Sequence, residues 1–543
     1  MNGPRSLSWR VEGSRRPAVA SLSRRWAALP AWQWQAAVML PLAVAFLWSA
    51  FGLRAPLALS GDEPHYLAVA QSLSLYGTLD QHLVLYHHDY YAYFPQRMSS
   101  HALHLDGHLY PLHYIGLPLV VLPGFAFAGA GGALATMATA ALGVCWLTLR
   151  LAARVAKRTP AALAVLGMGL SAPFVLNAAT IYPDMLGALF LLIVVELTSH
   201  GALTARRVLW SGVALAMTPW VHVKLLVPMA FLILWTLYRL WDEASRYQRA
   251  EAALPRRRRR RAGIDTLPSY AQRAPRNRPE TNLAPRGAAY IIGLPVLSVL
   301  ALLAFNGVVY GTPTLTAQFS LRGETLFSGN PLTGALGQIF AQGQGMLGAA
   351  PFLLLGFPGL VALWRRERAL AILVVAATYP FWAITLSYHD WWGGDSPPLR
   401  YLLEMLPFWT VGTAVLLDDL RGARMRAVTA GLGLLSLVLT LLLPWTARAG
   451  WPLPEGTSGP MQALGDVLHI PLTALLPLYT VGADDHGSWA TPLLLLPWAA
   501  ILAGLWIVFV PSANARLAAF WAAAAPAAAA RLSAAWRTLY PRP

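Results

Sequence analysis

Residues 34–53 read WQAAVMLPLAVAFLWSAFGL, and after six more residues the chain continues SGDEPHYL over 60–67. The first run carries no charge and has the ~20 apolar residues that a helix needs to cross a bilayer. Including it, about 12 apolar runs, most of them about 15–22 residues long, recur along the chain. The sequence therefore predicts an all-α polytopic membrane protein with about 12 transmembrane helices.

The composition excludes most soluble classes. Of the 543 residues, 56% are hydrophobic and 12% are charged, whereas a soluble domain has about 25% charged residues. This excludes an ordinary cytosolic enzyme and also a disordered or collagen-like chain. The one cysteine, Cys145, lies in an apolar run, so no intramolecular disulfide can form.

The basic residues predict the orientation in the membrane and explain the net charge of +17 without nucleic acid. Six arginines lie in the tail 1–33, and the positive-inside rule puts that tail in the cytoplasm. No small-residue cleavage site follows the first apolar run, so we interpret that run as a retained anchor. With both termini inside, 35 of the 41 basic residues lie in cytoplasmic segments and five lie outside. We predict a multi-pass protein of the plasma membrane with its polar chemistry on the outer face.

One apolar segment, 111–130, is kept out of the count of spans. If it crossed the membrane, the next run would carry the four basic residues between 150 and 158 to the outside. We therefore predict 111–130 as an outer-face or half-buried helix and 131–153 as the second span. The other spans are predicted near 160–176, 184–199, 208–220, 222–240, 288–309, 346–364, 369–387, 399–417, 427–447 and 491–511.

The domain organisation follows from these spans. Residues 1–33 form a basic cytoplasmic tail, and 34–511 form the transmembrane domain, in which 54–130 contains the first long outer loop. The segment 242–287 is rich in Pro and Arg, cannot bury a core and is predicted to be a disordered basic cytoplasmic linker. The Ala-rich end, 512–543, is predicted to be a cytoplasmic interfacial tail.

The most informative polar motif is the acidic pair Asp62-Glu63, which opens a helical pattern just beyond the first span. By itself the pair is typical of a helix start, with Asp62 as N-cap and Pro64 in the first turn. Its place favours more than a cap, because the pair lies immediately outside the predicted membrane surface and the long outer loop follows it. A cap and a pair of catalytic carboxylates are therefore both open readings of these residues.

In this respect the sequence resembles the GT-C superfamily of integral-membrane glycosyltransferases, especially the branch of protein O-mannosyltransferases and lipid A aminoarabinose transferases. Those enzymes carry an acidic pair in the first outer loop, on a helix parallel to the membrane. The resemblance rests on the order of several motifs over roughly 34–420. Besides the acidic pair, they are Asp106-Gly107, Tyr110-Pro111, Gly116-Leu117-Pro118, Tyr182-Pro183-Asp184, Pro219-Trp220-Val221-His222-Val223-Lys224, Trp391-Trp392-Gly393-Gly394 and Arg400-Tyr401-Leu402.

The resemblance implies an outward-facing active site in the outer loop within 54–130. There a sugar would move from a polyprenyl-phosphate donor to a hydroxyl of an envelope glycan, lipid or protein. The hydroxyl must lose a proton as it attacks the anomeric carbon, so a carboxylate base is needed. We predict that Asp62 is this base and that Glu63 orients it or holds the acceptor.

The leaving lipid phosphate needs a cation where its negative charge develops. The candidates are Lys224, its neighbour His222, and Arg400. A lysine in an apolar segment costs about 2.5–3.5 kcal/mol on insertion scales, so it should pair with a phosphate or a carboxylate, or else snorkel to the interface. Arg400 offers bidentate donors that suit a phosphate, with an ion pair to Glu404 or an interfacial anchor as the alternatives.

Further candidates lie in the other polar outer segments. Asp184 is the candidate ligand of a divalent cation, although the dipole of the helix that it starts also explains a carboxylate there. The segment 101–113 holds four histidines, and its Asp106-Gly107 is typical of a type I′ hairpin turn that pairs Leu105 with His108. The residues predicted to contact the sugar or the acceptor are His65, Tyr66, His113, Trp391 and Trp392.

Two other functional classes stay open at this stage. A lipid or solute transporter or flippase would place ionisable groups on broken helices at the bilayer midplane. In this chain such groups are essentially Glu196 and Lys224. A non-enzymatic assembly protein would leave Asp62 as a helix cap, without a chemical role.

Overall fold

The computed structural model describes most of the predicted transmembrane domain. The described residues are 29–53, 59–99, 101–252, 283–323, 327–388, 390–394, 396–446, 458–476, 499–504, 506 and 509. Most of the predicted N-terminal tail, most of the predicted span 491–511 and the whole predicted tail 512–543 therefore lie outside the described residues.

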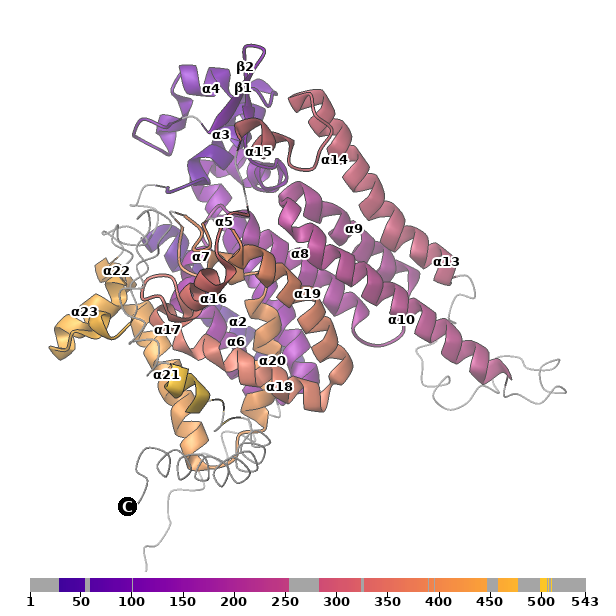
Figure 1. The fold of residues 1–543 in the computed structure, drawn as a ribbon, viewed down its shortest axis with the longest axis vertical. Helices are drawn as coiled ribbons and strands as arrows, with labels where there is room; N and C mark the ends of the chain where they lie inside the picture. The colour runs from indigo at the N-terminus through magenta and orange to yellow at the C-terminus, as the bar shows by residue number, and fades with distance from the viewer. Residues whose placement is uncertain are drawn as a thin grey trace, which may run out of the picture.

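The described chain is almost entirely helical (Figure 1). The longer helices are α2 (Ala31–Trp48), α3 (Glu63–Tyr76), α5 (Gly116–Val155), α6 (Arg158–Gly169), α8 (Pro183–Thr198), α9 (Ala205–Val221), α10 (Leu226–Ala252), α14 (Leu294–Tyr310), α16 (Pro331–Phe340), α18 (Gly356–Arg366), α19 (Arg368–Leu386), α20 (Leu406–Asp418), α21 (Ala423–Leu441) and α23 (Gly459–Leu468). The shorter α-helices are α4 (His82–Tyr86), α7 (Ala172–Asn177), α13 (Leu283–Ala288), α15 (Ala317–Arg322), α17 (Met346–Ala349) and α22 (Leu443–Thr446). Single turns of 3₁₀ or π-helix are η1 (Ser49–Leu53), η2 (Asp89–Ala92), η3 (Val223–Leu225), η5 (Ala289–Gly293), η6 (Pro351–Leu355), η7 (Arg400–Leu402) and η9 (Leu472–Leu475).

The prediction of an all-α polytopic membrane protein is confirmed. Within the described residues, 6 helical segments are long and apolar enough to cross a bilayer: Ala31–Leu53, Gly116–Val155, Val223–Arg246, Pro285–Tyr310, Arg368–Leu386 and Ala423–Leu441. Other predicted spans are built from shorter helices. The predicted span 160–176, for example, is divided between α6 and α7, and Pro173 lies in the first turn of α7. The total of about 12 spans therefore stays a prediction.

The helix α5 contains the break that the arginine count predicts near residue 130. Ala128 and Gly129 leave helical geometry, with φ of −140° and +59°. The two arms then approach closely, because a Cβ on Gly124 would lie 2.5 Å from the carbonyl oxygen of Gly132. The segments predicted as 111–130 and 131–153 are thus two helices that meet at a sharp bend.

The first long loop ends in a two-stranded hairpin of β1 (Ala102–Leu105) and β2 (His108–Pro111). The predicted register is confirmed, since Leu105 pairs with His108. The turn residues Asp106 and Gly107 both have positive φ, 49° and 83°, as a type I′ turn requires. Figure 1 shows α3, α4, α15 and this hairpin together at one end of the molecule, the hairpin end.

The opposite end of the helices, called the arginine end, is held by ion pairs. Arg150 and Arg154 both bind Glu196, which lies near the end of α8. Arg366, at the end of α18, binds Asp418 and Asp419 at the end of α20. The charges that the positive-inside rule assigns to the cytoplasm therefore gather where these helices end.

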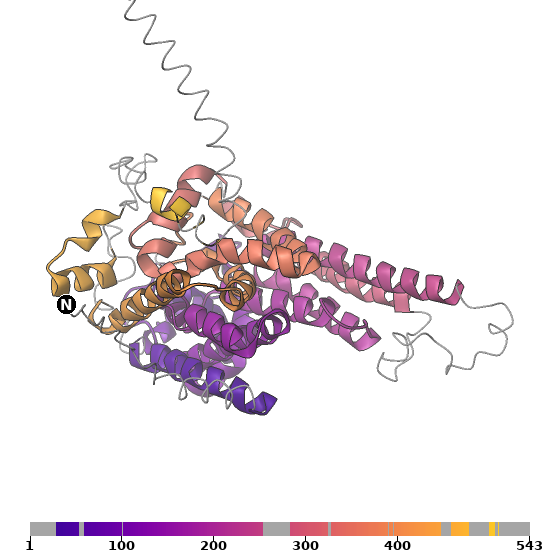
Figure 2. The same cartoon turned by 90° about the horizontal axis from the view of Figure 1, so that it is seen from below.

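The core lies around α20, whose side chains are buried almost throughout and which packs against α5, α6 and α18. Glycines allow the closest approach: a Cβ on Gly359 of α18 would lie 2.6 Å from the backbone of Gly412 of α20. The helices α8, α9, α10 and α14 form a second group on one side of the molecule (Figures 1 and 2).

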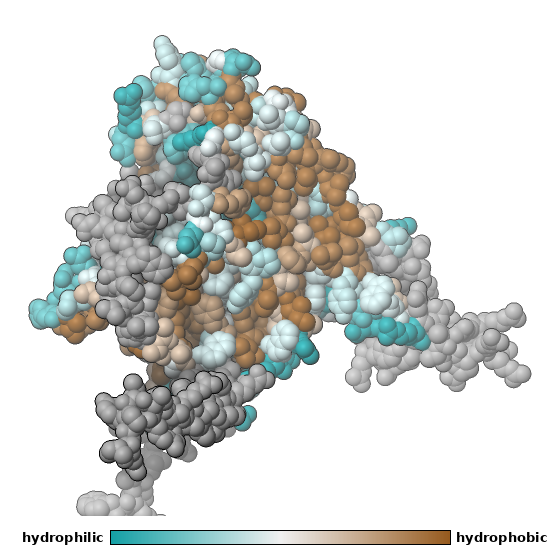
Figure 3. All heavy atoms as spheres, viewed as in Figure 1, coloured by the Kyte–Doolittle hydropathy of each residue, from teal (hydrophilic) through white to brown (hydrophobic). Residues whose placement is uncertain are grey.

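The outer surface of the second group is apolar. Figure 3 shows hydrophobic residues gathered over the side that α14 forms, with hydrophilic residues at the hairpin end and at the lower edge. On α14, Leu297 and Val308 are 64% and 87% exposed. Apolar side chains exposed over a whole helix are expected where the neighbouring medium is lipid.

The predicted linker 242–287 is shorter than the sequence suggests. The helix α10 continues to Ala252, and α13 begins at Leu283. The correction has a local cause: the segment Trp241–Ala252 is rich in good helix formers, and Asp242 pairs with Arg246 one turn later. Residues 253–282 lie outside the described part of the chain.

Candidate functional site

Asp62 lies at the hairpin end, at the first residue before α3, where Gly61 turns the chain with φ of +56°. Although Asp62 occupies the N-cap position, its side chain makes no capping hydrogen bond. The side chain is 27% exposed. The structure therefore does not support the reading of Asp62 as a plain helix cap, and its carboxylate is open to other partners.

Three side chains from distant segments surround the Asp62 carboxylate. His113 Nε2 lies 3.6 Å from Oδ1, His101 Nδ1 lies 3.7 Å from Oδ1, and Arg400 Nη1 lies 3.7 Å from Oδ2. The ring of His65 stacks on His101 with the centroids 3.9 Å apart. The site thus combines one partly exposed carboxylate, one arginine and several imidazoles.

The environment keeps Asp62 ionised. Burial alone would raise the pKa of its carboxyl, but positive charge on His113 and Arg400 outweighs this effect and holds the pKa below the usual 3.8. Burial and the neighbouring His101 lower the pKa of His65 to about 3. At neutral pH the site therefore holds an anionic Asp62 beside a neutral His65, and the lasting positive charge is that of Arg400.

Tyr66 forms the buried floor of this cluster. Its side chain is 3% exposed, and its ring lies 4.7 Å from that of His113. Burial raises the pKa of the Tyr66 hydroxyl, so it stays protonated. Of the residues predicted to contact sugar or acceptor, His113 is the one that the structure places directly beside Asp62, with His65 and Tyr66 packed behind the cluster.

Glu63, predicted to orient Asp62 or hold the acceptor, has a different place. Its side chain is fully buried, and its two oxygens accept hydrogen bonds from the backbone N–H groups of Ser60 at 3.0 Å and Ile181 at 2.9 Å. This corrects the prediction, because a buried carboxylate that holds two backbone donors has no surface for a substrate. Glu63 is a positioning residue that ties the start of α3 to the loop between α7 and α8.

We expect Glu63→Gln to destabilise the protein by about 1–3 kcal/mol, because the amide keeps the shape but leaves one buried N–H without an acceptor. The measurement is the melting midpoint of the purified protein in detergent, with tryptophan fluorescence used to monitor unfolding. The matched control is Asp106→Asn in the exposed hairpin turn, where asparagine also tolerates positive φ. Equal midpoints for both variants would contradict the positioning role.

Beneath Asp62 lies a buried network of four ionisable side chains. Asp184, at the start of α8, binds Lys224 through Oδ1 and Arg400 Nε through Oδ2, the latter at 2.9 Å. Lys224 Nζ also lies 3.0 Å from Glu404 Oε1. Asp184 is fully buried, Glu404 is 1% exposed, and Lys224 is 10% exposed. All four residues lie at or next to helix ends that meet below the hairpin.

The network decides between the alternatives left open for the cations. Lys224 does not snorkel, and its compensating partners are the carboxylates of Asp184 and Glu404. Arg400 pairs with Asp184 and not with Glu404. His222 is corrected from a phosphate contact to a cap, because its Nδ1 accepts a hydrogen bond of 3.2 Å from the backbone N–H of Lys224. Arg400 is therefore the cation of the network that reaches Asp62.

Aromatic rings surround the same cations. The Arg400 guanidinium lies 3.8 Å from the ring centroid of Tyr182, and Lys224 Nζ lies 4.8 Å from that of Tyr401. Trp391, predicted to stack on a sugar or the lipid, is 7% exposed, and a Cβ on Gly337 of α16 would lie 2.1 Å from its ring. This corrects the prediction for Trp391, whose ring packs against α16.

Trp392 lies beside Trp391, with ring centroids 5.7 Å apart and the planes at 84°. It is half-buried, so a contact with the lipid or the sugar stays a prediction for this residue. The two glycines that follow have φ of 97° and 64°, and the carbonyl of Gly393 accepts a hydrogen bond of 3.3 Å from Arg400 Nη1. The Trp-Trp-Gly-Gly segment therefore contributes to holding Arg400 in place.

The structure points to other candidate metal ligands than the sequence does. Both oxygens of Asp184 bind cationic side chains, which argues against its predicted role as a metal ligand. Within the described residues, Asp62, His101 and His113 each offer one ligand atom, and these atoms lie within 4.8 Å of one another. Two ligands of a tetrahedral Zn²⁺ site are roughly 3.3 Å apart when the metal–ligand bonds are about 2.0–2.1 Å. The cluster around Asp62 thus fits a divalent cation with small movements of the rings.

Four residues of the site were not among the predicted ones. His101 belongs to a loop with many histidines, and no local signal separates it from the others. The sequence offers Glu404 only as a partner of Arg400, whereas in the structure it pairs with Lys224. Tyr182 and Tyr401 are neighbours of Pro183-Asp184 and Arg400, so the sequence motifs that carried those residues already contained them.

No protein-family model and no curated protein matches the chain. Among solved structures, it is similar to ArnT from Cupriavidus metallidurans in the apo state, with 15% identity, a TM-score of 0.44, and coverage of 80% of this chain and 75% of that one. It is also similar to ArnT from Cupriavidus metallidurans bound to undecaprenyl phosphate, with 15% identity, a TM-score of 0.43, and coverage of 86% of this chain and 79% of that one. A third similar structure is the archaeal oligosaccharyltransferase AglB from Archaeoglobus fulgidus in complex with an inhibitory peptide and a dolichol-phosphate. The identity is 13%, the TM-score is 0.39, and the match covers 84% of this chain and 63% of that one.

These are likenesses, and the function proposed below rests on the side chains around Asp62.

Proposed function

We propose that this protein is a membrane glycosyltransferase that moves a sugar from a polyprenyl-phosphate donor to an acceptor hydroxyl, on the outer face of the plasma membrane. The observation that carries the proposal is the arrangement at Asp62. An ionised, partly exposed carboxylate without a capping bond lies 3.7 Å from a buried arginine, at the hairpin end of the helices. A base and a cation for a leaving phosphate are thus in one place.

In this mechanism Asp62 accepts the proton of the acceptor hydroxyl. The oxygen of that hydroxyl forms a bond to the anomeric carbon, and the bond from this carbon to the phosphate oxygen breaks. The lipid phosphate leaves with the electron pair, and Arg400 stabilises its growing negative charge. A single displacement with one base inverts the configuration of the anomeric carbon.

The other groups support these two residues. Asp184 binds Arg400 at Nε. A phosphate would therefore bind at the opposite side of the guanidinium group. Lys224 adds positive charge behind Arg400 and is largely neutralised by its two carboxylate partners. A divalent cation at Asp62, His101 and His113 would supply further positive charge for the phosphate, and its ligands would be those three side chains.

A transporter is less well supported. Its ionisable groups would lie on broken helices at the bilayer midplane. Here Asp184 begins α8, Lys224 precedes α10, and Arg400 and Glu404 precede α20, so the charged network lies at helix ends next to the hairpin. The place of the charges favours chemistry at the membrane surface.

The test is sugar release from labelled polyprenyl-phosphate hexoses and pentoses, with purified protein in detergent and crude envelope as acceptor. We expect release that depends on the envelope fraction and on one class of sugar. Parallel reactions with EDTA, and with Zn²⁺ or Mn²⁺ added back, report whether a cation at Asp62 takes part. Absence of release with every donor, from protein with a normal melting midpoint, would overturn the proposal.

The pH dependence gives a further prediction. Asp62 acts as base only when it is ionised, and its pKa is below 3.8. Activity is therefore lost only as the pH falls through that low value, and His65, with a pKa of about 3, does not titrate near neutral pH. We expect no acid limb in kcat/KM between about pH 5 and pH 8, the range in which an ordinary histidine titrates. An acid limb near pH 6 would instead indicate a histidine as the base.

A further inference from the structure

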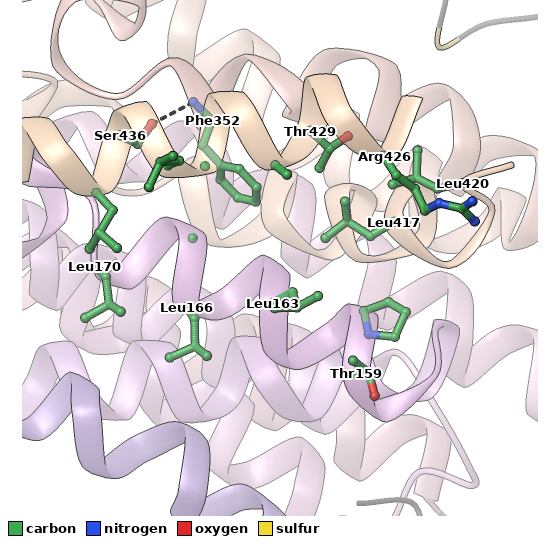
Figure 4. Close-up of a pocket in the computed structure, with 16 residues that line it drawn as sticks. Thr159, Leu163, Leu166, Leu170, Phe352, Leu417, Leu420, Arg426, Thr429 and Ser436 are labelled. Atoms are coloured by element: carbon green, nitrogen blue, oxygen red, sulfur yellow. Dashed lines mark hydrogen bonds between the residues drawn. The ribbon is translucent and has the colours of Figure 1, made fainter. Parts of the chain in front are cut away.

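A groove with no part in the proposed chemistry lies at the arginine end, between α6 and α21 (Figure 4). Its volume is about 560 Å³, within the range of about 300–1,000 Å³ that small-molecule sites have. Apolar side chains from the two helices face each other across it, among them Leu163 and Leu166 of α6 and Leu170, which directly follows this helix. The end of α20 closes it with Leu417 and Leu420.

The floor of the groove is formed by Phe352, which holds the two helices apart. A Cβ on Gly167 of α6 would lie 2.3 Å from its ring, and a Cβ on Gly433 of α21 would lie 3.6 Å from it. The backbone N–H of Phe352 donates a hydrogen bond of 2.9 Å to the Ser436 hydroxyl on α21. The groove is therefore a built feature, because Gly167 makes room for this ring and Ser436 holds its backbone.

The length of the groove fits one leaflet of a membrane. From Thr159 to Leu170 the helix α6 rises by roughly 16 Å, which is about half of the ~30 Å hydrocarbon core. Leu163 and Leu434, which line the groove, are 55% and 63% exposed. The groove is thus apolar, open at the side and long enough for one acyl chain.

Two polar side chains of α21 lie near one end of the groove and on one face of that helix, whereas Ser436, at the other end, is already hydrogen-bonded to Phe352 and Leu432. Arg426 is exposed at the mouth, at the same end of the groove as Thr159 on the opposite helix (Figure 4), and makes no ion pair within the described residues. Thr429, one turn deeper, is 9% exposed, and its buried hydroxyl has no hydrogen-bond partner in the described chain. Positions i and i+3 of a helix lie on one face, so a ligand that enters past Arg426 meets this hydroxyl next.

We propose that the groove binds an anionic glycerophospholipid of the leaflet at the arginine end. The lipid phosphate binds Arg426, an ester carbonyl accepts a hydrogen bond from Thr429, and one acyl chain lies along Leu163, Leu166 and Leu170. Along the groove the cation comes first, then the hydroxyl, then the apolar wall. This order matches the order of phosphate, ester and acyl chain in the lipid. The proposal is independent of the proposed glycosyl transfer.

The test is native mass spectrometry of the full chain in nonionic detergent, titrated with phosphatidylglycerol or phosphatidylcholine of equal chain length. We compare wild type with Arg426→Gln, Thr429→Val and Ala430→Phe, the last of which fills the groove from the exposed side of α21. The matched control is Arg424→Gln, on the same helix but outside the groove. A separate arm adds inorganic phosphate without lipid chains.

We expect wild type to bind phosphatidylglycerol in preference to phosphatidylcholine. One arginine at a membrane surface contributes about 1 kcal/mol, so Arg426→Gln should weaken binding about fivefold. Ala430→Phe should abolish it, Thr429→Val should weaken it, and Arg424→Gln should change it less than twofold. Equal effects of Arg426→Gln and Arg424→Gln would overturn the proposal.

Two other outcomes also overturn it, each for a different reason. Displacement of the lipid by inorganic phosphate would indicate a site for a free anion. Wild type that binds no lipid, together with a lower melting midpoint for Ala430→Phe, would indicate that another part of the protein fills the groove. Because none of the readouts is sugar transfer, failure here is separate from failure of the proposed function.

Discussion

Replacing Asp62 by asparagine is expected to lower kcat for sugar transfer by about 10²- to 10⁴-fold, the contribution of a general base. The amide has nearly the same shape and cannot accept the proton of the acceptor hydroxyl. Because Asp62 makes no capping hydrogen bond, the melting midpoint should stay close to that of the wild type. The measurement is release of labelled sugar at saturating donor, together with the melting midpoint in detergent.

The matched control is Asp106→Asn, which makes the same chemical change in the same outer loop at an exposed turn. It should transfer sugar like the wild type. Binding of the lipid-phosphate donor should be retained by Asp62→Asn, since the cation assigned to the phosphate is Arg400. If Asp62→Asn keeps more than about a tenth of the wild-type rate, the role of general base is wrong, because the loss would be too small for one.

The parts of the site that the sequence predicts are those set by local rules. The Asp106-Gly107 turn fixes the hairpin register, and the arginine count separates the two helices that meet near Gly129. The place of Asp62 just beyond the first apolar run is local information of the same kind, and its role as a base stays a prediction. In each case a few neighbouring residues, or their charges, carry the information.

The missed parts depend on contacts between distant segments. The sequence treats Asp62 and Glu63 as a pair, yet the N–H of Ile181, 118 residues away, decides that Glu63 is buried. The partner of Arg400 is Asp184, 216 residues away, and not the neighbour one helical turn along the chain. A helical or apolar pattern does not record which helix ends meet, and this meeting decides which charges are compensated and which stay available.

The second large effect is expected for Asp184→Asn, in the network below the site. Asp184 is fully buried between Lys224 and Arg400, so its loss leaves two buried cations with less compensation. Removing one partner from a buried pair costs about 3–5 kcal/mol, whereas Asp242→Asn, which breaks the surface pair with Arg246, should cost less than about 1 kcal/mol. The melting midpoints of the two variants in detergent, compared with that of the wild type, measure both losses of stability.

Adding Lys224→Met to Asp184→Asn tests whether this cost arises from charge. The methionine removes one of the two cations that lost a partner in the low-dielectric interior, so the double variant should be destabilised by less than the sum of the two single changes. Arg400 keeps its contact with Asp62 in both backgrounds, and donor binding should follow Arg400 and not Lys224. If the two single effects simply add, Asp184 and Lys224 do not act as a pair.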